Sequence, residues 1–166
     1  MVDTVHTTNA AKGPIVRIQA EDFDTAQIIE QATKDRSNVG AVVTFTGLCR
    51  DEGGKLAALE LEHYAGMAEA EITRIATRAF AHWPLDQLIA IHRYGKIAPG
   101  ENIVLVIATS SHRQAAFDAA SYLMDFLKTK APFWKKQHLI DGTSSEWVDA
   151  TEKDDKALER WKDVTG

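Results

Sequence analysis

The sequence contains a single cysteine, Cys49, among its 166 residues. One cysteine excludes an intrachain disulfide and any CxxC metal or redox pair. The six histidines never recur at a zinc-ligand spacing such as HExxH, so no metal site is predicted. No apolar run approaches the length of a membrane-spanning helix, and residues 1–13 lack the apolar stretch of a signal peptide. These absences favour a soluble, cytoplasmic protein.

The acidic balance of the chain limits its partners. Lysine and arginine together number 19 against 24 aspartates and glutamates, which gives a formal net charge of −5. A general nucleic-acid binder neutralises many phosphates with its cations, so this charge argues against that class. It remains compatible with one small anion bound in a local basic pocket.

The length and hydrophobic patterns predict one domain. Residues 1–13 are polar and are expected to form a disordered leader, which leaves 14–166 as a single domain. The β-branched apolar run at 40–47 is typical of a buried strand. Asp24 and Ser111 each precede a glutamine by three residues, as residues that cap the start of a helix do. Periodicity and turn residues predict strands at 15–19, 40–47, 56–64, 88–94, 102–110, 134–140 and 145–148, and helices from 24, at 67–83, at 112–130 and from about 154. This order predicts an α+β fold with a mixed, largely antiparallel sheet and packed helices.

Four cations gather in the segment 124–136, MDFLKTKAPFWKK, with only Asp125 as a local counter-charge. They are Lys128, Lys130, Lys135 and Lys136. Ammonium groups beside aromatic side chains suit a small, flat anion, and a desolvated lysine suits proton transfer because it titrates nearer neutrality than a free one. The segment also fits a solvated helix end that complements the helix dipole, and both interpretations stay open.

Cations also occur at the start of a predicted helix and at the end of a predicted strand, where binding an anionic ligand would account for their presence. His112 and Arg113 fall in the first turn of a predicted helix, where a cation opposes the dipole unless an anion such as a phosphate binds there. Arg50 follows the strand at 40–47 and is either a clamp for a phosphate or carboxylate or an exposed arginine. Cys49 is either a sulfur-carrying nucleophile or, more commonly for a lone cysteine at a strand end, a small core residue. Gly47 would allow a ligand or backbone to approach closely.

The spacing along one predicted helix bears on oligomeric state. Arg113 and Lys128 are fifteen residues apart in the sequence, which is about 22 Å along a helix axis. One small ligand cannot contact both within a single chain. If both belong to one site, neighbouring chains must share it, which predicts a homodimer with composite sites.

Six ordered blocks of the sequence resemble the large, catalytic subunit of molybdopterin synthase. They are GAVVTFTGLCR at 40–50, LELEHYAGMA at 59–68, HRYG at 92–95, PGE at 99–101, SHR at 111–113 and MDFLKTKAPFWKK at 124–136. Six blocks in conserved order and spacing are far more specific than any lone motif. The resemblance covers roughly residues 15–150 and implies a hammerhead-like α+β fold.

The resemblance also implies a reaction. Members of the family convert cyclic pyranopterin monophosphate into molybdopterin by installing two dithiolene sulfurs, with no permanently bound cofactor. The sulfur comes from the C-terminal Gly-Gly thiocarboxylate of a small ubiquitin-like carrier, whose tail enters the large subunit. The assembly is a heterotetramer built on a homodimer of large subunits, in agreement with the distance argument.

The matched motifs imply roles for individual residues. Lys128 and Lys135 match the catalytic lysines of the family, and Phe45 and Met124 would pack near the carrier's tail. The implied substrate-binding residues are Leu48, Cys49, Arg50, His112, Arg113, Lys136 and Gln137. Of these, His112 and Arg113 match a pair that reaches the substrate phosphate from the neighbouring subunit. Thr151 stands where an arginine can occur in the family.

Two other functions stay open as alternatives. A non-catalytic adaptor would bind the tail of a ubiquitin-like carrier and no pterin, although such a carboxylate needs fewer cations than Arg50, His112 and Arg113 supply. A sulfurtransferase of another kind would carry a persulfide on Cys49.

Overall fold

The computed structural model describes residues 13–148 and 156–165 of the chain. The leader predicted at 1–13 lies outside the described residues except for Gly13, and Thr151 lies outside them as well. The described strands are β1 (Ile15–Gln19), β2 (Ala41–Leu48), β3 (Leu56–His63), β4 (Leu85–Arg93), β5 (Gly95–Ile97), β6 (Asn102–Ser110) and β7 (Phe133–Leu139). The helices are α1 (Thr25–Thr33), α2 (Met67–His82), α3 (Arg113–Thr129), the 3-10 turn η1 (Glu159–Trp161) and α5 (Lys162–Thr165). This content confirms the predicted α+β class.

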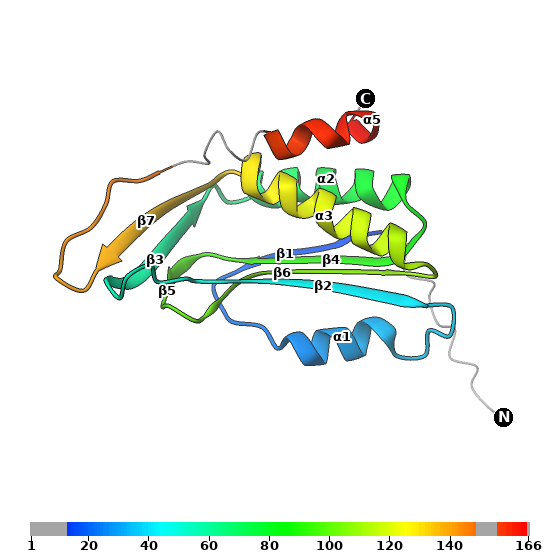
Figure 1. Ribbon diagram of the computed structural model, residues 1–166, viewed down its shortest axis with the longest axis horizontal. Coiled ribbons are helices and arrows are strands. Elements are labelled where there is room, and N and C mark those ends of the chain that lie inside the picture. Colours follow the sequence, from blue (N-terminus) through cyan, green and yellow to red (C-terminus); the bar gives the residue numbers. More distant parts are fainter. Residues whose placement is uncertain (1–12, 149–155, 166) are drawn as a thin grey trace.

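The strands form two sheets. The larger sheet has the strand order β1-β4-β6-β2, and the smaller sheet has the order β5-β3-β7. Among the described strands, β1 and β4 pair in parallel and the other neighbours pair antiparallel. In Figure 1, α2 and α3 cover one face of the larger sheet, α1 covers the other, and the smaller sheet extends beyond its end. The mixed, largely antiparallel arrangement agrees with the prediction.

Strand β6 lies at the centre of the core because both of its faces are apolar. Val104 and Val106 face the cluster built with α2 and α3, whereas Leu105 and Ile107 face the cluster built with α1. A strand that is buried on both faces requires a continuous apolar run, which the sequence supplies. No helix within residues 13–148 or 156–165 is both long enough and apolar enough to cross a membrane.

The strand predicted at 40–47 exists as β2, but the prediction that it is buried is wrong, because β2 lies at the edge of its sheet. It pairs with β6 on one side only. The side chains of Val42 and Phe45 remain 39% and 41% exposed. A β-branched apolar run does not distinguish a central strand from an edge strand, because the order of strands in a sheet is a tertiary property.

One predicted helix cap is confirmed and the other is wrong. The Asp24 carboxylate accepts a hydrogen bond from the backbone N–H of Gln27 at 3.0 Å, as the capping pattern predicted. Helix α3 instead has His112 as its N-cap and no side-chain cap. The Ser110 hydroxyl donates to the carbonyl of Pro84 and accepts from the backbone N–H of His112. These bonds hold the chain extended past Ser111, so the helix begins one residue later than predicted.

Short elements account for the remaining differences. Strand β5 was not predicted, because three residues are too few to show the alternation of apolar and polar side chains that marks a strand. The strand predicted at 145–148 is reduced to isolated bridges, in which Val148 pairs with Lys135 and Ser144 pairs with His138. Strand β4 begins at Leu85, three residues before the predicted start.

Tyr122 provides a test of this core. Its side chain is fully buried, and its hydroxyl has no hydrogen-bond partner in the described part of the chain. A buried, unpaired hydroxyl costs roughly 1–3 kcal/mol. We expect Tyr122→Phe, which keeps the ring, to raise the free energy of unfolding by about 1 kcal/mol in urea denaturation.

Thr109→Val is the matched control. The Thr109 hydroxyl is also buried, but it accepts a hydrogen bond from the backbone N–H of Gln87 at 2.9 Å. This substitution should lower the free energy of unfolding by about 1 kcal/mol. Equal losses of stability in Tyr122→Phe and Thr109→Val would contradict the prediction.

Candidate active site

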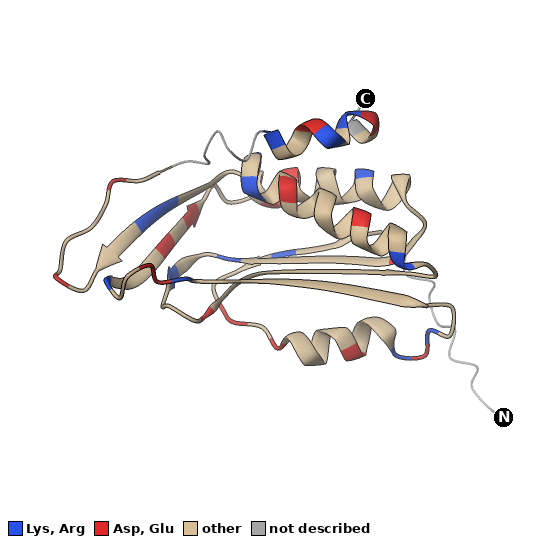
Figure 2. Ribbon diagram, in the orientation of Figure 1, with Lys and Arg blue, Asp and Glu red and all other residues tan. Residues whose placement is uncertain are grey.

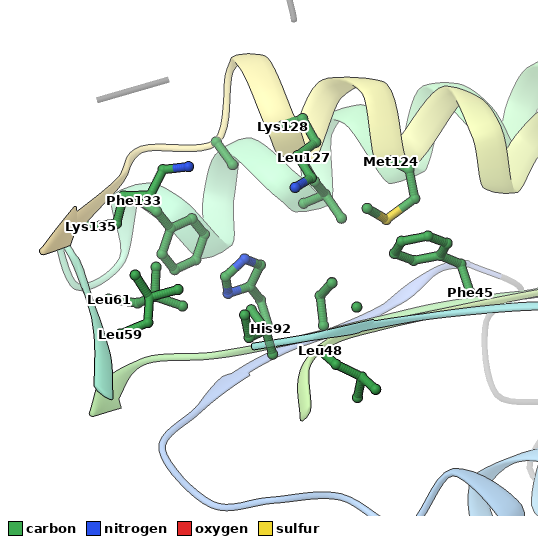
Figure 3. A pocket seen from close by; sticks show the side chains of 14 residues that line it. Phe45, Leu48, Leu59, Leu61, His92, Met124, Leu127, Lys128, Phe133 and Lys135 are labelled. Atoms are coloured by element: carbon green, nitrogen blue, oxygen red, sulfur yellow. The ribbon is translucent and has the colours of Figure 1, made fainter. Parts of the chain in front are cut away.

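A cavity of about 170 Å³ lies where the two sheets meet the C-terminal half of α3. Its wall is largely apolar, and the polar side chains that line it are His92, Lys128 and Lys135. Figure 3 shows the amines of Lys128 and Lys135 pointing toward one another across this cavity. The structure therefore brings together the two lysines that the resemblance singled out.

Local structure explains how two lysines reach one cavity. Lys128 lies in the last turn of α3, where a cation complements the negative end of the helix dipole. Pro132 follows and cannot continue the helix, so the chain turns into β7. Alternation along β7 places Lys135 on the same face as Phe133, and Lys135 lies opposite Leu61 of β3.

Among the described residues, the two lysines have no acidic partner to neutralise them. Neither Lys128 nor Lys135 forms an ion pair within residues 13–148 and 156–165. Asp125, the local counter-charge in the sequence, accepts hydrogen bonds at 2.6 Å from both Arg160 and Trp161 of η1. The C-terminal segment thus occupies the nearby carboxylate, and the cavity keeps an uncompensated positive charge that suits an anionic ligand.

His92 is the third polar group of the cavity. Its ring stacks on Phe133, with 3.9 Å between ring centroids and 17° between ring planes. Burial lowers the pKa of His92 to about 4, although its hydrogen bond to the Arg93 carbonyl acts in the opposite direction. The charges of Lys128 and His63 contribute to this lowered pKa. His92 is therefore neutral at pH 7.

The apolar wall includes three residues predicted from the resemblance. Phe45, Leu48 and Met124 all line the cavity, and Figure 3 shows Phe45 beside Met124 at the end away from Lys135. Their proposed contacts with a carrier tail or substrate stay predictions. Gly47 lies between Phe45 and Leu48, and a Cβ there would come within 2.6 Å of the Val104 side chain. The expected close approach at this glycine is therefore to a neighbouring side chain.

The prediction that Lys136 and Gln137 line the same pocket is not supported. Lys136 points to the opposite face of β7, because neighbouring residues of a strand alternate. It lies opposite Glu60 in the pairing with β3, and its amine sits 5.5 Å from the centre of the Trp147 ring. Figure 2 shows the acidic stretch of β3 beside the basic stretch of β7. Gln137 shares the face of Lys135 and is exposed as Lys135 is, but it does not line the cavity.

Cys49 and Arg50 also lie outside the cavity wall. Cys49 is 3% exposed and packs with Leu61 and Ile97, which agrees with the small core residue and not with a substrate contact. Arg50 is exposed and forms an ion pair with Glu52 in the loop that follows β2. A substrate contact by Arg50 therefore requires this exposed pair to separate, which costs little at a solvated surface.

His112 and Arg113 lie at the other end of α3 from Lys128. His112 is the N-cap and Arg113 the first residue of a helix that ends at Thr129, and both are exposed. Neither lines the cavity. The structure agrees with the distance argument: these cations and the lysines do not form one site within a single chain.

Sequence reasoning missed part of the cavity wall. Leu59 and Leu61 share one face of β3 by alternation, but only the register of β3 with β7 places them beside Lys135. The sequence alone does not assign His92, because a histidine at a strand end fits a structural role as well as a place in a pocket wall. Its neighbours in the cavity come from α3 and β7, which are distant in the sequence.

Comparisons with known proteins give the family. The family model described as MoaE protein matches residues 18–130. A molybdopterin synthase catalytic subunit from Mesorhizobium japonicum is 62% identical over 154 residues, covering 93% of this chain and 97% of that protein. The molybdopterin biosynthesis MoaE protein from Burkholderia ambifaria MC40-6 has a TM-score of 0.77 at 42% identity, covering 89% of this chain and 97% of that chain. A complex of subunits 1 and 2 of molybdopterin-converting factor from Helicobacter pylori 26695 shares the fold, with a TM-score of 0.65 at 19% identity over 84% of this chain and 91% of that chain. On the family model and on identity over almost the whole length, this chain belongs to the MoaE family.

Proposed function

We propose that the chain is the catalytic subunit of a molybdopterin synthase. It transfers sulfur from the C-terminal thiocarboxylate of a small ubiquitin-like carrier to cyclic pyranopterin monophosphate, and the product is the dithiolene of molybdopterin. The observation that carries this proposal is the convergence of Lys128 and Lys135, without acidic partners, on one apolar cavity in a chain of this family. No permanently bound cofactor is needed for the reaction, and the cytoplasm is the proposed compartment.

The chemistry requires cations at the point of transfer. The anionic sulfur of the thiocarboxylate forms a bond to a side-chain carbon of the pterin, and an oxygen leaves that carbon with a proton. Water then cleaves the acyl–sulfur bond and leaves a carboxylate on the carrier. One lysine of the pair neutralises the sulfur and the other donates the proton. A second carrier supplies the second sulfur.

The shape of the cavity suits the carrier's tail. Two glycines carry no side chains, and a cavity of about 170 Å³ with Phe45, Leu48 and Met124 in its wall leaves little room for any. The structure of the Helicobacter pylori relative is a complex of two different subunits, which supports a small partner subunit here. A heterotetramer of two large and two small subunits is the proposed assembly.

The substrate phosphate is assigned to the neighbouring copy. His112 and Arg113 are exposed at the N-terminal end of α3, where free backbone N–H groups and the helix dipole favour an anion. Because they lie at the far end of α3 from Lys128, a homodimer that places one chain's α3 start near the other's cavity would complete the site.

Lys135→Ala is expected to lower synthase turnover by about a hundredfold or more, since it removes a charge that acts in the transition state. Lys128→Ala should have an effect of the same order. Lys136→Ala is the matched control: Lys136 is the next residue but lies on the other face of β7, so turnover should stay within about threefold of wild type. The assay supplies cyclic pyranopterin monophosphate and thiocarboxylated carrier and measures the dithiolene pterin.

Two outcomes of that assay would contradict the proposal. Near wild-type turnover in both Lys128→Ala and Lys135→Ala would remove the lysines from the chemistry. No product from the wild-type chain, in spite of a stable complex with a cognate carrier, would favour the adaptor, and fluorescence titration with pterin would then show no binding.

Mixed dimers test the composite site. Lys128→Ala and Arg113→Ala chains should each be inactive alone, because every site in either homodimer lacks one cation. Random exchange of the two variants makes about half of the dimers mixed, each with one intact site, so about a quarter of wild-type activity should return. If the mixture stays inactive while light scattering shows that the chains exchange, the shared site is wrong.

Cys49 separates the carrier mechanism from a persulfide mechanism. Burial raises the pKa of the Cys49 thiol, and the charges of Glu101 and Asp51 raise it further, so the thiolate forms only at a higher pH than usual. At pH 8 we expect iodoacetamide to modify Cys49 at least about tenfold more slowly in the folded protein than in urea. Cys49→Ala should keep its synthase activity. Fast modification together with an inactive Cys49→Ala protein would favour the persulfide.

A further inference from the structure

His92 lies in the cavity wall, and the reaction proposed above leaves it without a task. Its Nδ1 atom is 2.8 Å from the carbonyl oxygen of Arg93. A carbonyl oxygen only accepts hydrogen bonds, so Nδ1 carries the proton of the neutral ring and Nε2 keeps a lone pair. Stacking on Phe133, with 3.9 Å between centroids, fixes the plane of the ring. His92 is thus a hydrogen-bond acceptor of fixed orientation.

The charged groups around His92 keep it in this state. Lys128 of α3 and His63 of β3 lower its pKa, in addition to the larger effect of burial. Lys135 of β7 lines the same cavity. Arg93, the next residue on β4, donates its side-chain hydrogen bonds to two backbone carbonyls. No acidic side chain lines the cavity, so nothing there favours a protonated His92 at pH 7.

The possible donors to Nε2 are few. Within residues 13–148 and 156–165, Nε2 has no hydrogen-bond partner. Apart from His92 itself, the side chains of the cavity wall that can donate are Lys128 and Lys135. Of these two, Lys128 is the one whose charge is among the main causes that lower the pKa of His92. Figure 3 shows the Lys128 amine above the His92 ring, which lies beside Phe133.

We infer that His92 is a positioning residue whose Nε2 accepts a hydrogen bond from the Lys128 ammonium, directly or through one water. A ring that stays neutral at pH 7 directs this cation without taking its proton. Lys128 is thereby aimed at the anion in the cavity. The catalytic consequence rests on the proposed function; the contact itself does not.

The contact can be tested on the purified chain without carrier or pterin. Nitrogen-15 spectra of histidine-labelled protein should show His92 as the Nδ1–H tautomer. Lys128→Met, which keeps the apolar stem, should shift the Nε2 resonance toward that of an acceptor without a donor. Lys135→Met is the matched control and should leave the resonance in place. A response to Lys135→Met alone, or to neither variant, would overturn the inference.

Kinetics test the consequence. His92→Phe keeps a ring for Phe133 but has no nitrogen, so we expect kcat to fall about tenfold with KM changed less than about threefold. His92→Gln retains a donor and an acceptor and should restore most of the loss. His63→Phe is the control, because His63 also contacts Phe133, at 5.9 Å between centroids, but does not line the cavity.

The outcomes separate this inference from the proposed function. Wild-type kcat in a folded His92→Phe protein, as judged by its melting temperature, would overturn the positioning role. If His92→Phe does not fold, the nitrogen-15 comparison of the two lysine variants still decides the contact. Absence of turnover in the wild-type chain would contradict the synthase proposal. The nitrogen-15 spectra would still show whether His92 accepts a hydrogen bond from Lys128.

Discussion

The close packing of α3 on the larger sheet is the constraint on which the other features depend. The buried residues in the first half of α3 are all small, namely Ala115, Ala116, Ala119 and Ala120, whereas its second half buries Tyr122, Leu123, Phe126 and Leu127. Small side chains let the helix lie close to the strands, and interiors packed to this density do not shift easily. Once the axis of α3 is fixed, so are its two ends. The helix therefore delivers Lys128 to the cavity and holds Arg113 far from it.

Alternation along β7 then sorts the remaining cations. Lys135 and Lys136 are neighbours in the sequence, yet the pairing of β7 with β3 directs Lys135 into the cavity and Lys136 toward Glu60 and Trp147 on the other face. Lys135 keeps an uncompensated charge, whereas the Lys136 amine lies over the Trp147 ring. Adjacent lysines therefore have different surroundings. This explains why only Lys128 and Lys135, of the four lysines clustered in the sequence, line the cavity.

The charges that face the cavity are all positive, because the nearby carboxylate of Asp125 is bound by other residues and the ring of His92 is neutral. Asp125 is held by Arg160 and Trp161, and His92 is kept neutral by burial. The two lysines are left as the charges that face the apolar wall. Such a cavity attracts an anion through the charge of the two ammonium groups, although both lysines are exposed to solvent.

The sequence by itself determined the class of the fold, the bounds of β6 and the cap at Asp24, and it singled out Lys128 and Lys135 as candidate catalytic residues. These depend on local periods, on a short-range capping bond and on six ordered motifs. The spacing of Arg113 and Lys128 also predicted that one chain would not join them. The edge position of β2, the burial of Cys49, the outward face of Lys136 and the part played by His92 were decided only by tertiary structure. In each case the deciding neighbour comes from a distant segment: β6 beside β2, Leu61 against Cys49, Glu60 opposite Lys136, and Phe133 and Lys128 around His92. Strand order and register create these contacts, and no local pattern encodes them.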